Sequence, residues 1–415
     1  MSFLRAASPG SGGTIRLLWL PVLTALALGM PFLGNAISVF GVDNRIASIG
    51  LSVVVFLVAI VLPGNRMTFS FRLVGLIAFF LLTAFSATGK QVEQLFVLPE
   101  ADFRYSDEAL RLLFIGPIAF SILAYLVSFI FREDRAHRAF HRTALGLAVA
   151  AVGLLILNWS AFTSGWMVLS DARRGISGND MAFSTISASL LILHGFFCTW
   201  MLVGNRVLRT GLLVVFAISI ILLLQRTHMV LLLLPPVMST FGELRPSRLP
   251  IRVAILTGML LAGYWAIGNL DLFGNANLYF RGFAEAGDTR LAEIQLAWGT
   301  FLERPAGLGL GEFSHISRSH FGYPHNIFIE AFVEEGLLAG LLLLLLTGSG
   351  VARVFADYSR CSAPGKVTRL LFLAVLFQGM KSSSIPTSTH FFFLLVLLLC
   401  LPPASPDRAP LPQGR

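Results

Sequence analysis

The sequence predicts an all-α polytopic membrane protein, with about twelve transmembrane helices in a single membrane domain over residues 1–415. Three observations predict this class. The 415 residues are 55% hydrophobic and 13% charged, with a mean hydropathy of +0.77, a balance outside that of soluble globular domains. Apolar runs recur along the whole length, which leaves little sequence for a separate soluble domain. Arginine and lysine gather in alternate loops, as they do in loops that stay in the cytoplasm.

The expected spans are apolar stretches of roughly 17–25 residues. Pro235 and Pro236 interrupt the eighth of them, and the eleventh is polar. The run 17–33 follows Arg5 and Arg16 and could pass for a signal peptide, but the later spans make cleavage unnecessary, so it is kept as the first helix. The spans lie near 17–33, 46–62, 72–88, 110–131, 143–162, 182–203, 211–224, 229–241, 251–268, 329–350, 369–384 and 388–402.

Charge provides an independent test of this layout. With the N-terminus inside, the inner segments hold more than half of the 31 basic residues and few of the 22 acidic ones. A shift of one helix would invert the later loops, so both termini are expected on the cytoplasmic side. The formal charge of +9 is therefore explained by topology, and no nucleic-acid partner is expected because no basic helix or aromatic-basic module is present. The inner segments are 66–72, 132–142, 206–209, 245–252, 353–369 and both termini.

The longest expected outer loop covers residues 269–328 and has about sixty residues, far more than a connection needs. It contains many aromatic residues, which a disordered tether would lack. Thr289–Glu303 is predicted to be a helix that ends at Arg304-Pro305, before the glycine-rich run Gly307–Gly311. Function is expected in this partly helical loop, or in the shorter outer loops 88–109 and 163–181.

A dense constellation runs from Arg290 through R-L-A-E-I-Q-L-A-W and R-P-A-G-L-G-L-G-E-F to Y-P-H-N-I-F-I-E-A-F-V-E-E-G-L-L-A-G, which ends at Gly340. It resembles the O-antigen ligase and polymerase family of bacterial envelope glycosyltransferases. In that family an arginine and tryptophan, a glycine-rich turn and a His-Asn pair before a helix recur in this order. The resemblance is specific over 290–340. Chain length and the single dominant outer loop are most similar to the ligase branch.

The resemblance implies a GT-C-like enzyme of the bacterial inner membrane, with its active site facing the periplasm. It implies metal-independent, inverting transfer of a glycan from an undecaprenyl diphosphate carrier to lipid A-core in lipopolysaccharide biosynthesis. The implied partners are the carrier-linked donor, the lipid A-core acceptor and membrane lipids. No cofactor is implied.

His325 is the predicted general base. A hydroxyl nucleophile needs a base near neutral pH, and histidine is the side chain whose unperturbed pKa lies there. His325 follows Pro324 at the mouth of the tenth expected span. The alternative is an interfacial histidine that only hydrogen-bonds a loop. Asn326 and Glu330 either orient the ring or cap the helix, and Tyr323 is expected to contact substrate.

Arginines are the predicted clamp for the diphosphate leaving group, since its charge needs either a metal held by carboxylates or guanidinium groups. The expected outer loops have no Asp-x-Asp pair. Arg290 matches the family's position before the tryptophan. Arg174, with Arg173 beside it in D-A-R-R-G-I-S-G-N-D, is similar to the family's external Arg-Gly turn. Arg290 and Arg174 are the leading candidates, and Arg173 is expected to bind substrate.

Two further arginines are candidate substrate ligands. Arg226 stands in L-L-Q-R-T-H, where the family often has Ser-Arg-Gly. An arginine near membrane depth is a functional candidate, although a polar hairpin tip would explain it equally. Arg281 stands in Y-F-R-G-F, where cation–π packing against Phe280 or Phe283 is the alternative.

No metal site is expected. His315, His320 and His325 are spaced by five residues, which places successive side chains about 140° apart on a helix, and they have no acidic or cysteine partners at fixed spacing. The three cysteines form no Cys-x-x-Cys pair and no disulfide framework.

Three alternatives stay open. An O-antigen or capsule polymerase and a protein O-oligosaccharyltransferase would share the base and the arginines but differ in acceptor. A lipid-linked glycan transporter is the alternative from another class. Transporters place ionisable groups at mid-membrane, whereas the acidic residues here fall in expected loops or near helix ends.

Overall fold

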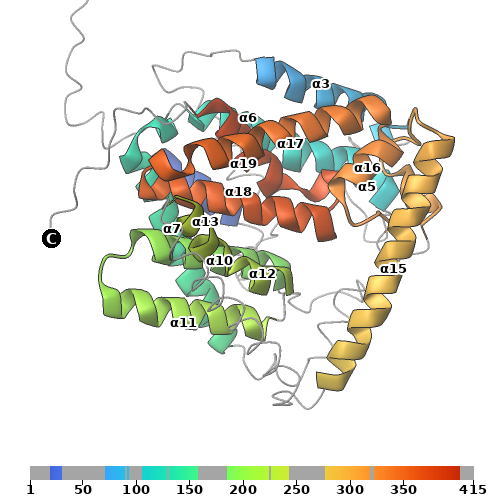
Figure 1. The fold of residues 1–415 in the computed structure, drawn as a ribbon. Coiled ribbons are helices and arrows are strands. Elements are labelled where there is room, and N and C mark those ends of the chain that lie inside the picture. Colours follow the sequence, from blue (N-terminus) through green and yellow to red (C-terminus); the bar gives the residue numbers. More distant parts are fainter. Residues whose placement is uncertain are drawn as a thin grey trace, which may run out of the picture.

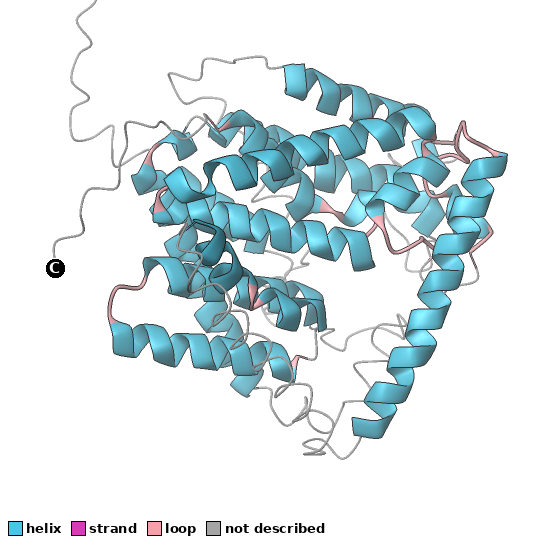
Figure 2. Cartoon of the chain, in the orientation of Figure 1, coloured by secondary structure: helices cyan, strands magenta, loops and turns pink. Residues whose placement is uncertain are grey.

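The computed structural model describes residues 19–29, 71–88, 91–92, 105–128, 130–157, 185–223, 226–242, 276–317 and 322–401. Every regular element in these ranges is a helix (Figure 2), which confirms the all-α prediction. Among the described residues, three helices are long and apolar enough to cross a membrane, at Ala109–Ser128, Asp134–Ile156 and Leu337–Arg360. Shorter apolar helices lie at Trp19–Gly29, Arg72–Phe85, Ala188–Leu202, Thr227–Ser239 and Thr389–Cys400. The predicted spans 46–62 and 251–268 lie outside the described residues.

The first-half spans that fall in described residues are helices. The fourth is interrupted by a π-helical turn at Phe114–Ile118, which contains Pro117, a residue with no N–H for the α-helical ladder. The elements are α3 (Phe71–Phe85), α5 (Tyr105–Leu113), the π turn, α6 (Ala119–Ser128), a 3-10 turn at Ile130–Arg132, α7 (Asp134–Leu157) and α10 (Thr185–Leu202).

Two predicted boundaries were wrong. The inner segment 132–142 is not a loop, because α7 begins at Asp134. Arginine and alanine are good helix formers, so the helix continues past the apolar run that hydropathy detects. The tenth span, predicted as one helix near 329–350, is two helices: α16 (Ile327–Glu334) and α17 (Leu337–Asp357). They are separated at Gly336, whose φ of 89° lies in the region that favours glycine.

The other second-half spans that fall in described residues are also helices. The eighth is interrupted as its prolines predict: α12 (Arg226–Leu231) ends before α13 (Leu234–Gly242), in whose first turn Pro235 and Pro236 stand. The remaining elements are α11 (Arg206–Leu222), α15 (Ala276–Glu303), a 3-10 turn at Glu312–His315, a 3-10 turn at Tyr358–Arg360, α18 (Ala363–Ser382), a 3-10 turn at Ile385–Thr387 and α19 (Thr389–Cys400).

The bundle is built around α19, which is buried along almost its whole length. Its rings at Phe391, Phe392 and Phe393 are fully buried, and Phe392 lies 5.8 Å from Phe79 of α3 between ring centroids. α6, α17 and α18 pack along α19, and α7 with α10 forms the next layer (Figure 1). This core contains few charged groups, so burial of apolar surface is its main source of stability.

Apolar side chains also cover the outside of the bundle. On α11, Val207, Val214 and Ile218 are each at least half exposed, and α17 exposes Leu338 and Leu345 to a similar degree. A water-soluble monomer rarely exposes contiguous apolar faces of this kind. They are the faces expected of helices that contact lipid.

The two ends of the bundle gather different segments. At one end Ile385 N donates a hydrogen bond to Glu330, and α15 stands beside α16 (Figure 1). At the other end Ser362 donates to Asp134, and Arg353 donates to the backbone oxygens of Leu398 and Leu401 at the end of α19. Within the described residues, parts of the predicted outer loops 88–109 and 269–328 therefore meet at one end, and the predicted inner segments 132–142 and 353–369 meet at the other.

Candidate functional site

The predicted helix Thr289–Glu303 is the C-terminal part of α15, which ends before Arg304 as expected. Pro305 follows, and it has no N–H with which to continue the ladder. Phe301 lies 5.2 Å and Trp298 6.0 Å from Phe332 of α16, between ring centroids. Aromatic pairs at this spacing are attractive beyond the area that they bury. This contact fixes α15 against α16, and Arg290 is on the same helix.

The glycine-rich run caps the end of α16. The N–H groups of Leu308 and Gly309 donate to the carbonyls of Val333 (2.9 Å) and Glu334 (2.8 Å). These carbonyls lie in the last turn of α16, where the helix itself offers no donors. Gly307 has a φ of 93°, and a Cβ at this position would meet Glu334 O at 2.3 Å. The glycine therefore permits a backbone approach that a side chain would block.

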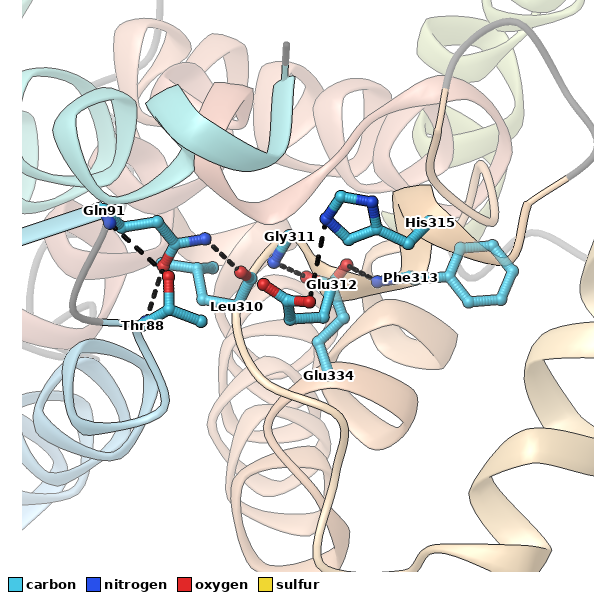
Figure 3. Close-up of polar contacts among 8 residues, drawn as sticks. All are labelled: Thr88, Gln91, Leu310, Gly311, Glu312, Phe313, His315 and Glu334. Carbon is cyan, nitrogen blue, oxygen red and sulfur yellow. Dashed lines mark hydrogen bonds and ion pairs between the residues drawn. The ribbon is translucent and has the colours of Figure 1, made fainter. Parts of the chain in front are cut away.

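The side chain of Glu334 fastens the same run (Figure 3). Its carboxyl oxygens accept hydrogen bonds from the backbone N–H of Gly311 (2.8 Å) and Phe313 (3.3 Å). Glu334 is fully buried, and this burial raises the pKa of its carboxyl to about 8, against the opposing effect of the two N–H donors. On the other side of the run, Gln91 Nε2 donates to Leu310 O at 2.6 Å. The loop is thus held by hydrogen bonds from both sides.

His325 lies between the glycine-rich run and α16. Its φ of 59° is the left-handed conformation, which costs a non-glycine residue about 1–2 kcal/mol. The side chain is 6% exposed, and its ring centroid is 4.7 Å from that of Tyr323. Burial, and to a smaller extent the positive charge of Arg290, lowers the pKa of His325 to about 4. The imidazole is therefore neutral at pH 7.

Tyr323 shares this environment. Burial raises the pKa of Tyr323 to about 12; Glu330 acts in the same direction, and Arg290 opposes both. Its phenol is thus protonated at neutral pH and can donate a hydrogen bond. Arg290 therefore lies near both rings. Three of the predicted residues are close together although they come from α15 and from the segment before α16.

Asn326 and Glu330 have separate tasks. Asn326 is the N-cap of α16, with its Oδ1 accepting from the N–H groups of Phe328 (3.0 Å) and Ile329 (3.3 Å). Of its two expected roles, the structure shows the capping one. Glu330 is fully buried and accepts a hydrogen bond from Ile385 N at 3.1 Å. It therefore joins α16 to the turn between α18 and α19.

The other predicted arginines are not placed at this site. Arg173 and Arg174 lie outside the described residues. Arg226 is the first residue of α12, and Arg281 lies in the first part of α15, and the side chains of both are outside the described set. Their roles stay predictions.

The loop histidines differ in their surroundings. His315 is half exposed and lies 3.7 Å from Glu312 (Figure 3), whereas His325 is buried beside Tyr323. His320 lies outside the described residues. Among the described residues, the cluster of potential metal ligands instead joins His141, His194 and Cys198 inside the bundle.

Sequence reasoning missed Glu334 and Gln91 as determinants of the site. Both bind backbone groups, so their partners carry no sequence signal. One clue was available: Glu334 and Glu335 are two carboxylates in an otherwise apolar stretch, and acidic residues there are rare unless they bind something. Comparison of the chain with protein-family models, curated proteins and solved structures found no match.

Proposed function

We propose that this chain is a membrane glycosyltransferase, an O-antigen ligase that transfers a glycan from undecaprenyl diphosphate to lipid A-core. One observation carries the proposal. Arg290 and Tyr323, both partly buried, lie beside the buried His325, and Glu330 accepts a hydrogen bond from the turn between α18 and α19. A neutral base and a cation are the groups that this transfer requires, and the phenol of Tyr323 can donate a hydrogen bond beside them.

The proposed reaction is an inverting displacement at the anomeric carbon. The acceptor hydroxyl attacks, the bond from the anomeric carbon to the diphosphate oxygen breaks, and Nδ1 or Nε2 of His325 receives the hydroxyl proton. Arg290 stabilises the negative charge of the departing diphosphate. The anionic donor beside Arg290 would also offset the cation that lowers the pKa of His325, so donor binding strengthens the base.

The proposal includes a location for the site. We assign the end of the bundle that holds His325 to the periplasmic face of a bacterial inner membrane, within a GT-C-like domain of about twelve spans. Two features support this assignment. The described parts of the predicted outer loops 88–109 and 269–328 meet at that end, and the helices expose apolar faces suited to lipid. Both termini would then lie in the cytoplasm.

The test is the surface-glycan profile of a strain that lacks the protein. Uncapped lipid A-core, with long polymer still on the carrier, is the expected result. Single repeat units on the core would indicate a polymerase instead, an intact lipopolysaccharide with loss of protein-linked glycan would indicate a protein oligosaccharyltransferase, and an unchanged profile would favour a transporter. Chelation of divalent ions is expected to leave transfer intact, whereas loss of transfer in EDTA would show that a metal clamps the diphosphate.

A further inference from the structure

A second cluster of chemically active side chains lies inside the bundle, among residues for which the proposed function has no use. His141 of α7 and His194 and Cys198 of α10 are all buried. One ring nitrogen of each histidine and the cysteine sulfur lie within 4.8 Å of one another. His194 and Cys198 are four residues apart, so they share a face of α10, and α7 packs along that helix.

The hydrogen bonds of His141 define which of its nitrogens has a free electron pair. Thr368 Oγ1 donates to Pro364 O at 3.4 Å and lies 3.0 Å from His141 Nε2. Because the hydroxyl proton is directed to the carbonyl, the hydroxyl oxygen accepts from His141 Nε2–H. The lone pair is then on Nδ1, which lies 2.9 Å from His194 Nε2. A histidine that donates its second N–H to a neighbouring residue is the usual arrangement of a metal ligand.

We propose that His141, His194 and Cys198 form a binding site for one Cu(I) ion. Thiolate and imidazole are ligands that suit this soft ion. Charge selects it over Zn²⁺: one thiolate and two neutral imidazoles make a complex of zero net charge with Cu(I), but of net charge +1 with Zn²⁺. An uncompensated charge in the apolar interior is costly. Binding replaces the thiol proton of Cys198, which is released to solvent. The proton on His194 Nε2, which points to His141 Nδ1 in the metal-free site, moves to Nδ1 of His194, so that the ring stays neutral and Nε2 binds the ion.

The surroundings allow the ligands to adjust. A cavity of about 40 Å³ is lined by His194, His390 and Phe140, next to the cluster. A metal between two imidazole nitrogens at about 2.0–2.1 Å from each needs more than their hydrogen-bond separation, so the His194 ring must move by a few tenths of an ångström. The cavity gives it room on one side. Cys198 Sγ now donates to His141 O at 3.4 Å and would turn toward the ion.

The test is Cu(I) binding by the full-length protein in detergent under anaerobic conditions, with competition by a chromophoric Cu(I) chelator. Wild-type protein is expected to hold one copper per chain. Cys198→Ser can keep the hydrogen bond to His141 O, and His194→Gln can keep a donor toward His141 Nδ1, so both variants retain the helix contacts. Each is expected to bind copper at least about tenfold more weakly. X-ray absorption should show one sulfur and two nitrogen neighbours.

Cys361→Ser is the matched control, since Cys361 lies in the turn before α18 and not in this cluster. It is expected to bind as wild type does. Thermal melting of each metal-free variant shows that it is folded. Absence of copper from the wild type, equal binding by Cys198→Ser, or preferential binding of Zn²⁺ would each overturn the proposal.

Discussion

Arg290 lies close enough to His325 for its positive charge to lower the pKa of the imidazole, although burial is the larger cause. The two residues come from different elements, α15 and the segment before α16. Their proximity follows from the aromatic contact between Trp298 or Phe301 and Phe332, which fixes α15 against α16. Because Arg290 is this close to His325, it can contact the substrate on which His325 acts. Substitution of Arg290 should therefore change both substrate use and the pH dependence of transfer.

Arg290→Gln is expected to move the acid limb of the kcat/KM profile upward, as well as to weaken donor use. His325 is active when neutral, so activity falls as the pH drops through its pKa, which is about 4 in the wild type. Removal of the nearby cation raises that pKa toward its ordinary value, although burial keeps it below. The measurement is transfer of a carrier-linked glycan between pH 3.5 and 7 in vesicles.

Arg304→Gln provides the comparison, because Arg304 is exposed just beyond the end of α15. It should leave the acid limb unchanged. An identical profile for Arg290→Gln and wild type would mean that Arg290 does not act on the base.

His325 substitutions are expected to separate folding from activity. The two variants are His325→Gly and His325→Asn, because a φ of 59° suits glycine and asparagine. His325→Gly relieves backbone strain but increases the conformational entropy of the unfolded chain. These effects oppose each other. We expect the free energy of unfolding of either variant, measured by thermal melting, to differ from wild type by no more than about 1 kcal/mol. Transfer should be lost in both. Activity near wild type in His325→Asn would exclude this residue as the base.

The fold could be predicted from sequence wherever an apolar run decides it. Hydropathy finds the stretch that lipid can surround, so each predicted span within described residues contains helix. Hydropathy does not find helix ends. Asp134 begins α7 within a polar segment, and Gly336 divides α16 from α17 within an apolar one. Those ends depend on backbone conformation and capping bonds. The count of twelve stays a prediction.

The site was predictable only where residue type signals chemistry. Arg290, Tyr323 and His325 could be chosen because their side chains suit the transfer, and they lie together. Glu334 was missed, because it binds the N–H groups of Gly311 and Phe313, which every residue except proline possesses. The Cu(I) candidate was missed for another reason: His141 and His194 are distant in sequence, and only helix packing brings them to 2.9 Å.

Gly307→Ala is expected to destabilise the glycine-rich run. Its φ of 93° is unfavourable for alanine, and the added Cβ would meet the backbone oxygen of Glu334 at 2.3 Å. Backbone cannot move aside cheaply, so we expect a loss of about 2–4 kcal/mol. Gly299→Ala is the matched control, because nothing lies within 4 Å of its Cβ position, near the C-terminal end of α15. It should stabilise by up to about 1 kcal/mol. Thermal melting of both proteins checks the pair, and equal melting temperatures would contradict it.

Glu334→Gln is expected to loosen the loop and to change its pH dependence. An amide has a single oxygen, so one of the N–H groups of Gly311 and Phe313 would face an NH₂ group. The loss should be about 1–3 kcal/mol at pH 6, measured as faster hydrogen exchange at these two amides. Burial raises the pKa of Glu334 to about 8, against 4.5 ordinarily. Its contribution in the wild type is therefore complete below pH 4.5 and lost as the pH rises through 8.

Glu335→Gln gives the matched comparison, because Glu335 is also buried but neither of its carboxyl oxygens has a hydrogen-bond partner in the described part of the chain. Burial raises the pKa of this carboxyl as well, so either variant should reduce the fall in stability between pH 7 and 9. Only Glu334→Gln should accelerate exchange at Gly311 and Phe313 at pH 6. Equal acceleration in both variants would show that loss of either buried carboxyl group, and not loss of the hydrogen bonds that Glu334 accepts, loosens the loop beside His325.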